Sequence, residues 1–97
     1  MSKQELRAVE EVQADNETVK VTQYVFAPGA ATGWHRHTHD YVIVPLTTGT
    51  LRIIDGKGES SLADLTAGKT YFRKAGVEHD VQNANEFEFA FVEVEIK

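Results

Sequence analysis

Short runs rich in β-branched and aromatic residues alternate with turn signals along this chain of 97 residues, and this alternation restricts its fold more than any other feature. The runs predict strands, which we expect at residues 18–27, 34–39, 41–46, 51–54, 60–65, 70–73, 79–82 and 87–96. Pro28-Gly29 and Asp55-Gly56 are among the turn signals between them, and the second is typical of a two-residue hairpin. About eight short strands without a long helical pattern predict an all-β protein, an antiparallel sandwich or barrel.

The length of the chain suits a single domain, which we expect to cover residues 1–97. Residues 1–17 form an N-terminal arm or an edge strand in this interpretation, because their apolar residues have only a loose helical spacing. The last predicted strand has phenylalanine at 87, 89 and 91 but aliphatic residues at 92, 94 and 96, and these two sets have opposite parity. We expect a β-bulge near Phe91 and Val92, since it would keep both sets on one inward face.

Composition excludes several classes of function. The chain has no cysteine, which rules out a thiol nucleophile, a thiolate zinc site and a disulfide framework. The formal net charge is −5, and the 10 basic residues are scattered singly, so we expect no nucleic-acid partner. The N-terminal segment lacks the apolar stretch of a secretory signal, and no run approaches the ~20 apolar residues of a membrane-spanning helix. We therefore expect a cytoplasmic protein without a membrane partner.

The histidines carry the main functional signal. Three of the 4 lie in the run His35-Arg36-His37-Thr38-His39, and the fourth is His79. Side chains two residues apart on a strand point to the same face, so His35 and His37 can direct their imidazoles to one point. A ligand from another strand could then complete a metal site. From spacing alone, a solvated polar strand edge remains a second interpretation.

Two segments resemble the two sequence motifs of the cupin family. The first has Gly29, His35, His37 and Gly49 at every spacing of the first motif, but Val42 stands where the family has a glutamate. The second has Gly68, Gly76, His79 and Asn83 at the spacing of the second motif, with Lys74 in place of a proline. The matches occur in the expected order and cover most of residues 29–83.

The resemblance implies a small antiparallel jelly-roll β-barrel, also called a double-stranded β-helix, with one divalent metal ion in its mouth. The implied ligands are His35, His37 and His79. Iron, manganese, nickel and zinc all suit imidazole donors, so the sequence does not choose among them. Valine cannot replace the missing glutamate, which leaves positions open for a chelating ligand. His39 or Asp40 could also supply a fourth ligand.

Other residues near these motifs are candidates for chemistry. We expect Tyr41 and His39 to move protons. Arg73, Trp34 and Tyr71 are candidates for binding the substrate, with Arg73 suited to a carboxylate. The predicted function is a metal-dependent enzyme of dioxygenase, isomerase or lyase type acting on a small anionic or chelating metabolite. The alternatives are a non-catalytic module that binds or senses a small molecule or metal, and a purely structural barrel. We also expect a homodimer formed through edge strands.

Overall fold

A computed structural model describes residues 6–97, which form strands and loops without a helix. The strands are β1 (Val9–Asp15), β2 (Val19–Phe26), β3 (His35–Arg36), β4 (Asp40–Pro45), β5 (Gly49–Ile54), β6 (Ser60–Leu65), β7 (Tyr71–Arg73), β8 (Glu78–Asn83) and β9 (Phe89–Ile96). The all-β class expected from the sequence is confirmed. Nothing in this part of the chain is a helix long and apolar enough to cross a membrane.

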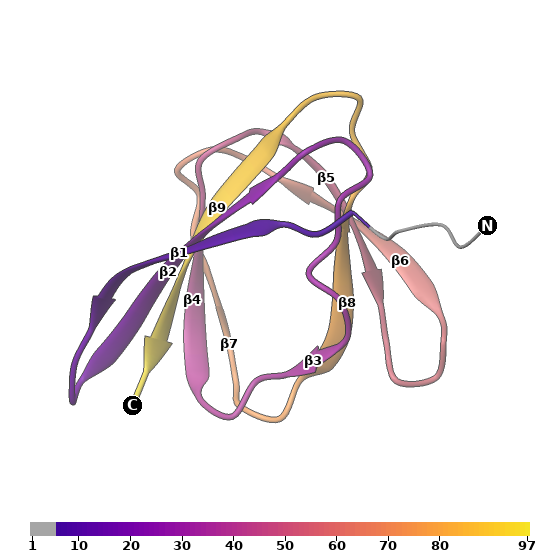
Figure 1. Ribbon diagram of the computed structural model, residues 1–97. Helices are drawn as coiled ribbons and strands as arrows, with labels where there is room; N and C mark the ends of the chain where they lie inside the picture. The colour runs from indigo at the N-terminus through magenta and orange to yellow at the C-terminus, as the bar shows by residue number, and fades with distance from the viewer. Residues whose placement is uncertain (1–5) are drawn as a thin grey trace.

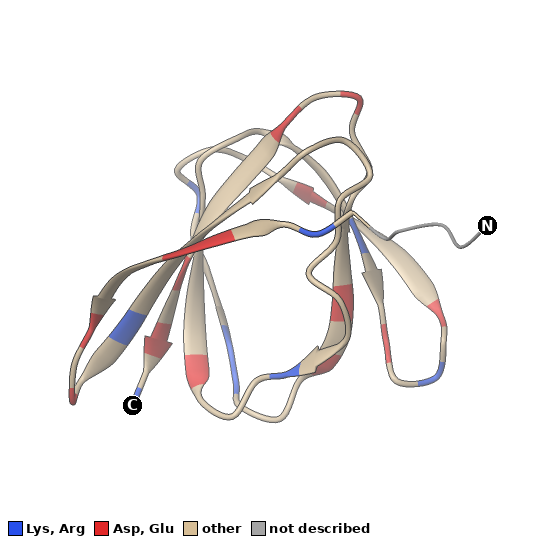
Figure 2. Cartoon of the chain, in the orientation of Figure 1, with Lys and Arg blue, Asp and Glu red and all other residues tan. Residues whose placement is uncertain are grey.

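The strands form two antiparallel sheets that face each other (Figure 1). The larger sheet has the order β1-β2-β9-β4-β7, and the smaller sheet has the order β3-β8-β5-β6. Aromatic and aliphatic side chains fill the space between them. The fully buried members include Phe26, Tyr41, Leu51 and Phe89. Lysine and arginine are spread over separate strands and loops (Figure 2).

Most predicted strands lie where the alternation placed them, and three details differ. The run at 34–39 contains only the two-residue strand β3, because the chain leaves the sheet after Arg36. The turn after β5 is longer than a two-residue hairpin, since the Asp55 backbone N–H donates to the carbonyl of Glu59. Of the two alternatives for the N-terminal segment, an arm or an edge strand, the structure has the edge strand β1, which pairs with β2, while residues 1–5 lie outside the described part.

The β-bulge predicted in the last strand is absent. The register of β9 against β2 is continuous from Phe89 to Ile96, and its register against β4 is continuous as well. Phe89, Phe91 and residue 93 therefore face the core, while Val92 and its even-numbered neighbours face outward. The prediction was wrong because the aliphatic residues pack on the outer face of the sheet, and the inward position 93 is a glutamate.

Candidate metal centre

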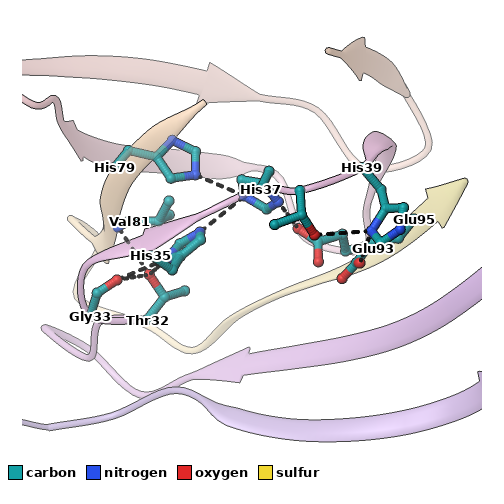
Figure 3. A network of polar contacts seen from close by, with 10 residues as sticks. Thr32, Gly33, His35, His37, His39, His79, Val81, Glu93 and Glu95 are labelled. Carbon is teal, nitrogen blue, oxygen red and sulfur yellow. Dashed lines mark hydrogen bonds and ion pairs between the residues drawn. The ribbon is translucent and has the colours of Figure 1, made fainter. Parts of the chain in front are cut away.

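Three imidazoles meet at one point between the two sheets (Figure 3). His35 on β3 and His79 on β8 are directly paired positions, and His37 follows β3. Backbone hydrogen bonds to Val77 and Gly76 hold His37 beside the start of β8. The Nε2 atom of His37 lies 3.0 Å from that of His35 and 3.1 Å from that of His79. The structure thus brings together the three ligands that the sequence motifs implied.

The hydrogen bonds of the rings show that this donor set fits a divalent ion. The Nδ1 atom of His35 donates to the carbonyl of Gly33 at 2.9 Å, which leaves its Nε2 as a bare acceptor. The Nδ1 atom of His37 lies 3.5 Å from the Oε1 of Glu93, and the Nε2 of His37 is bare when Nδ1 carries the ring proton. The Nε2 atoms of His35 and His37 lie 3.0 Å apart, so these two nitrogens share either a proton or a cation. An ion about 2.1 Å from two nitrogens at right angles separates them by about 3.0 Å.

Burial keeps the site ready to accept a cation. It lowers the pKa of His37 to about 4, with a further contribution from His35 and then His79. Burial and the neighbouring His35 also lower the pKa of His79 to about 4. These two imidazoles are therefore neutral at pH 7, and a metal ion does not have to displace protons from them.

Tyr41, not Val42, is the β4 residue beside the histidines. Tyr41 and Ile43 are buried on the inner face of the strand, whereas Val42 lies on its outer face. The Tyr41 ring stacks on that of His37, with 3.8 Å between the ring centroids. The open ligand position inferred at Val42 was therefore placed on the wrong face of β4. Neighbouring side chains on a strand point to opposite faces, so a shift of one residue moves the position from one face to the other.

The sequence reasoning missed Glu93, a carboxylate that lies next to the centre. It is 4% exposed, and its Oε1 is 3.5 Å from the Nδ1 of His37. Burial and, after it, the nearby Glu95 raise the pKa of Glu93 to about 8, and a cation at the histidines would favour the ionised carboxylate. The signal that could have found it is the parity of β9, since residue 93 shares the face of Phe89 and Phe91. With the expected bulge near Phe91 and Val92, residue 93 would instead lie on the outer face of the sheet.

The two alternative ligands lie away from the centre. His39 is outside the group of converging histidines, and its Nδ1 faces Glu95 at 3.6 Å (Figure 3). It shares the spacing of the other two, but the chain no longer runs as a strand at this point, so strand parity does not apply. Asp40 accepts a hydrogen bond from the backbone of Ala75 at 2.8 Å. Neither residue is positioned as a fourth ligand, and His39 is not positioned to move protons at the cluster.

An open cavity of about 540 Å³ leads to the cluster and is lined by His79, Tyr41, Tyr71 and Arg73. The Arg73 guanidinium lies 4.6 Å from the centre of the Tyr71 ring. Lys69, which the sequence reasoning did not single out, also lines this cavity. A smaller cavity of about 30 Å³ lies between the three histidines and Tyr41. Two of the three predicted substrate-binding residues therefore lie beside the centre.

Trp34 is the exception. Its side chain is 54% exposed, and it does not line the cavities beside the histidines. The end of its indole lies near Gly56 in the turn after β5. Arg36 faces outward, with its Nε 3.9 Å from Oε1 of Glu78.

Comparison with known proteins agrees with this fold. Residues 22–95 match the family model of the cupin domain. The chain is 59% identical over 91 residues to the β-alanine degradation protein BauB of Pseudomonas aeruginosa, covering 94% of this chain and 95% of the relative. It is 51% identical to a cupin domain from Bordetella pertussis whose crystal structure superposes with a TM-score of 0.94, covering 99% of both chains.

A more distant structure shares the fold alone. This RmlC-like cupin with a double-stranded β-helix fold, from Methanocaldococcus jannaschii, is 17% identical and has a TM-score of 0.76, covering 99% of this chain and 85% of its own. The expected jelly-roll is thereby confirmed. The matched domain spans most of the nine strands, so the chain belongs to the cupin family.

Proposed function

We propose that the chain is a metal-dependent enzyme that acts on a small anionic or chelating metabolite at His35, His37 and His79. The observation that carries this proposal is the open cavity of about 540 Å³ that reaches His79. Its volume suits a small metabolite. Lys69 and Arg73 in its wall supply positive charge for a carboxylate.

The bound ion would supply Lewis acidity toward a chelating substrate. The separations of 3.0 and 3.1 Å between the Nε2 atoms support an ion that takes ligands at right angles. Iron(II), manganese and nickel meet this requirement more readily than zinc, which prefers a tetrahedral site. We therefore propose one of these three ions as the cofactor.

Tyr41 is the proton-transfer group in this proposal. It lines both the small cavity between the histidines and the larger open one. Burial raises the pKa of Tyr41 to about 12, with a further contribution from Glu93. The hydroxyl therefore keeps its proton at pH 7 and acts as a donor toward a substrate held at the centre.

The name of the relative from Pseudomonas aeruginosa supports a role in catabolism. That protein is described as a β-alanine degradation protein. We propose that this chain acts on a short carboxylate of the same kind of pathway, within the cytoplasm. Oxygen-dependent cleavage, isomerisation and lyase chemistry all fit a chelating carboxylate next to a proton donor.

The test is a matrix of metals and substrates. Metal-free protein is reconstituted separately with Fe²⁺, Mn²⁺, Ni²⁺ and Zn²⁺, and each form is incubated with short oxo acids, β-alanine, small thiols and β-diketones. Oxygen uptake and product formation by NMR are followed with and without air. We expect turnover of a carboxylate with one of the first three ions. Saturable binding without turnover under every condition would instead identify a binding module.

Arginine variants test the substrate class. Arg73→Gln should raise the KM for the carboxylate about tenfold, the loss expected for one charge-assisted contact. Arg52→Gln is the matched control, because Arg52 is exposed on β5 and lies outside the cavity. Equal KM values for the wild type and Arg73→Gln would contradict an anionic substrate at this position.

A further inference from the structure

Glu93 is a buried acid at the middle of the larger sheet. Its position on β9 pairs with Thr22 of β2 on one side and with Ile43 of β4 on the other. Only 4% of its surface is exposed, while Phe89 and Phe91 on the same face belong to the core. Burying a carboxyl group among such residues is costly unless it has a partner. The identity of that partner indicates what the residue does.

Glu93 also interacts with the side chains of Glu95 and Tyr24, and the partner that links it to the site is one of the three converging histidines. Its Oε1 lies 3.5 Å from the Nδ1 of His37, and both side chains are almost completely buried. The opposite nitrogen of the same ring, Nε2, faces His35 and His79 (Figure 3). Glu93 thus lies behind His37, on the side of the ring away from the centre. It can act on a bound ion only through this imidazole.

His35 has a weaker partner in the equivalent place. Its Nδ1 donates to the backbone carbonyl of Gly33 at 2.9 Å, and the hydroxyl of Thr32 lies 3.2 Å from the same nitrogen. Both partners are uncharged. A carboxylate behind a ligating imidazole raises the basicity of the other nitrogen more than a carbonyl does. His35 and His37 are therefore unequal ligands, because His37 has a carboxyl group beside its Nδ1 and His35 has uncharged groups there.

We propose that Glu93 is a positioning residue that orients His37 and supplies, from behind the ligand, the negative charge that three neutral imidazoles lack. This inference rests on the metal-dependent function proposed above. Two more observations support it. Tyr41 stacks on the flat side of His37, which leaves rotation in the ring plane to be fixed by the group at Nδ1. Val42, at the motif position of the family's glutamate, points to the outer face.

Metal affinity of three variants tests the proposal. Glu93→Gln keeps the shape of the side chain and removes its charge, and it should weaken Co²⁺ or Fe²⁺ binding about 10- to 100-fold in competition titrations. Glu93→Asp retains the charge but moves it farther from His37, and it should give a smaller loss of metal affinity. Glu88→Gln is the matched control, because Glu88 is exposed just before the start of β9 and its loss of charge is the same. Its affinity should stay within about threefold of the wild type.

A spectroscopic measurement separates positioning from a merely structural effect. At saturating Co²⁺, the visible absorption reports the donor strength of the ligands. We expect its band to shift in Glu93→Gln and to remain unchanged in Glu88→Gln. Circular dichroism and urea unfolding of each metal-free variant check that the fold is intact. If Glu93→Gln does not fold, Glu93→Asp takes its place in the comparison.

The outcomes distinguish the two proposals. Wild-type affinity and an unshifted band in the folded Glu93 variant would overturn the role of Glu93 and leave the metal centre in place. A wild-type protein that binds no metal would overturn the metal centre itself, and the proposed function with it. Weakened binding of equal size in Glu93→Gln and Glu88→Gln would reduce the effect to general loss of negative charge, which also contradicts the proposal.

Discussion

Tyr41 lies where β4 passes the three histidines, and its ring stacks on that of His37. It is 2% exposed, so the ring contributes to the core as well as to the wall of the open cavity. These two roles belong to different parts of the side chain. The ring packs against an imidazole, and the hydroxyl is the proposed proton donor. A substitution that removes only the hydroxyl therefore separates them.

Tyr41→Phe should bind metal as the wild type does and lose most of its activity. The stacked ring remains, whereas the proton donor is removed, and general acid catalysis typically contributes about 10²- to 10⁴-fold to a rate. The two measurements are the metal stoichiometry and kcat with the substrate that the matrix of metals and substrates identifies. A Tyr41→Phe enzyme with wild-type kcat would exclude the hydroxyl from the reaction.

At the scale of elements, Asn83 at the end of β8 ties three segments together. Its side chain is 3% exposed, and its Nδ2 lies within hydrogen-bonding distance of the carbonyls of Phe26, Ala27 and Phe87. Its Oδ1 accepts from the backbone N–H of Asn85. The end of β2 and the loop before β9 are thereby fixed to the strand that carries His79. This explains why an asparagine stands at the last position of the second motif.

Asn83→Ala should lower the free energy of unfolding by about 2–4 kcal/mol, because several buried backbone groups lose their partner at once. Gln82→Ala is the neighbouring control, since Gln82 is only half-buried and its side chain makes one long contact with Asp80. Its effect should be within about 0.5 kcal/mol. Urea unfolding of the two variants measures the difference, and equal stabilities would show that Asn83 does not hold these segments.

The sequence predicted elements better than it predicted the faces of elements. Turn residues and β-rich runs located eight strands, because both signals depend on local backbone chemistry. The edge strand β1 was one of two alternatives for residues 1–17, because all its residues are exposed and no apolar alternation marks it. The three histidines could be identified from motif spacing, and Tyr41 was predicted to transfer protons. The position of Glu93 and the stacking of Tyr41 on His37 could not be predicted, because they depend on which way β9 and β4 face, and this is decided by packing between the sheets.

At the scale of the whole molecule, the outer face of the larger sheet is apolar over most of its area. It carries aliphatic and aromatic residues from four strands, among them Val21, Val25, Val42, Val44, Phe72, Val92, Val94 and Ile96. Phe72 and Ile96 are 47% and 42% exposed. Strands about 4.8 Å apart and about 20–25 Å long give this face on the order of 500–600 Å² before corrugation.

We propose that a second copy of the chain covers this face and forms the homodimer. A standard interface buries about 800 Å² per partner, which the face and its rim can supply. The face is nearly free of charge, so two chains of net charge −5 can approach there without strong repulsion. This places the contact on the sheet surface, whereas the sequence had suggested the edge strands.

Val94→Glu should convert the dimer to a monomer. Val94 lies between Val21 and Val42 in the sheet, at the centre of the proposed contact, and the substitution would bury a carboxylate there. Sedimentation equilibrium of the wild type should give about twice the chain mass of 10.8 kDa. Leu62→Glu on the edge strand β6 is the control, since Leu62 is 63% exposed and lies in the other sheet. A monomeric Leu62→Glu with a dimeric Val94→Glu would move the interface to the edge.

The most direct test of the account is the metal content of four proteins purified without added metal and then loaded with Fe²⁺ under nitrogen. These are the wild type, His37→Ala, His79→Ala and His39→Ala, and His39→Ala serves as the control because this residue lies outside the cluster. After dialysis, elemental analysis should find about one ion per chain in the wild type and in His39→Ala, and almost none in the other two. Metal retained in both His37→Ala and His79→Ala, or lost equally from His39→Ala, would contradict the three-histidine centre.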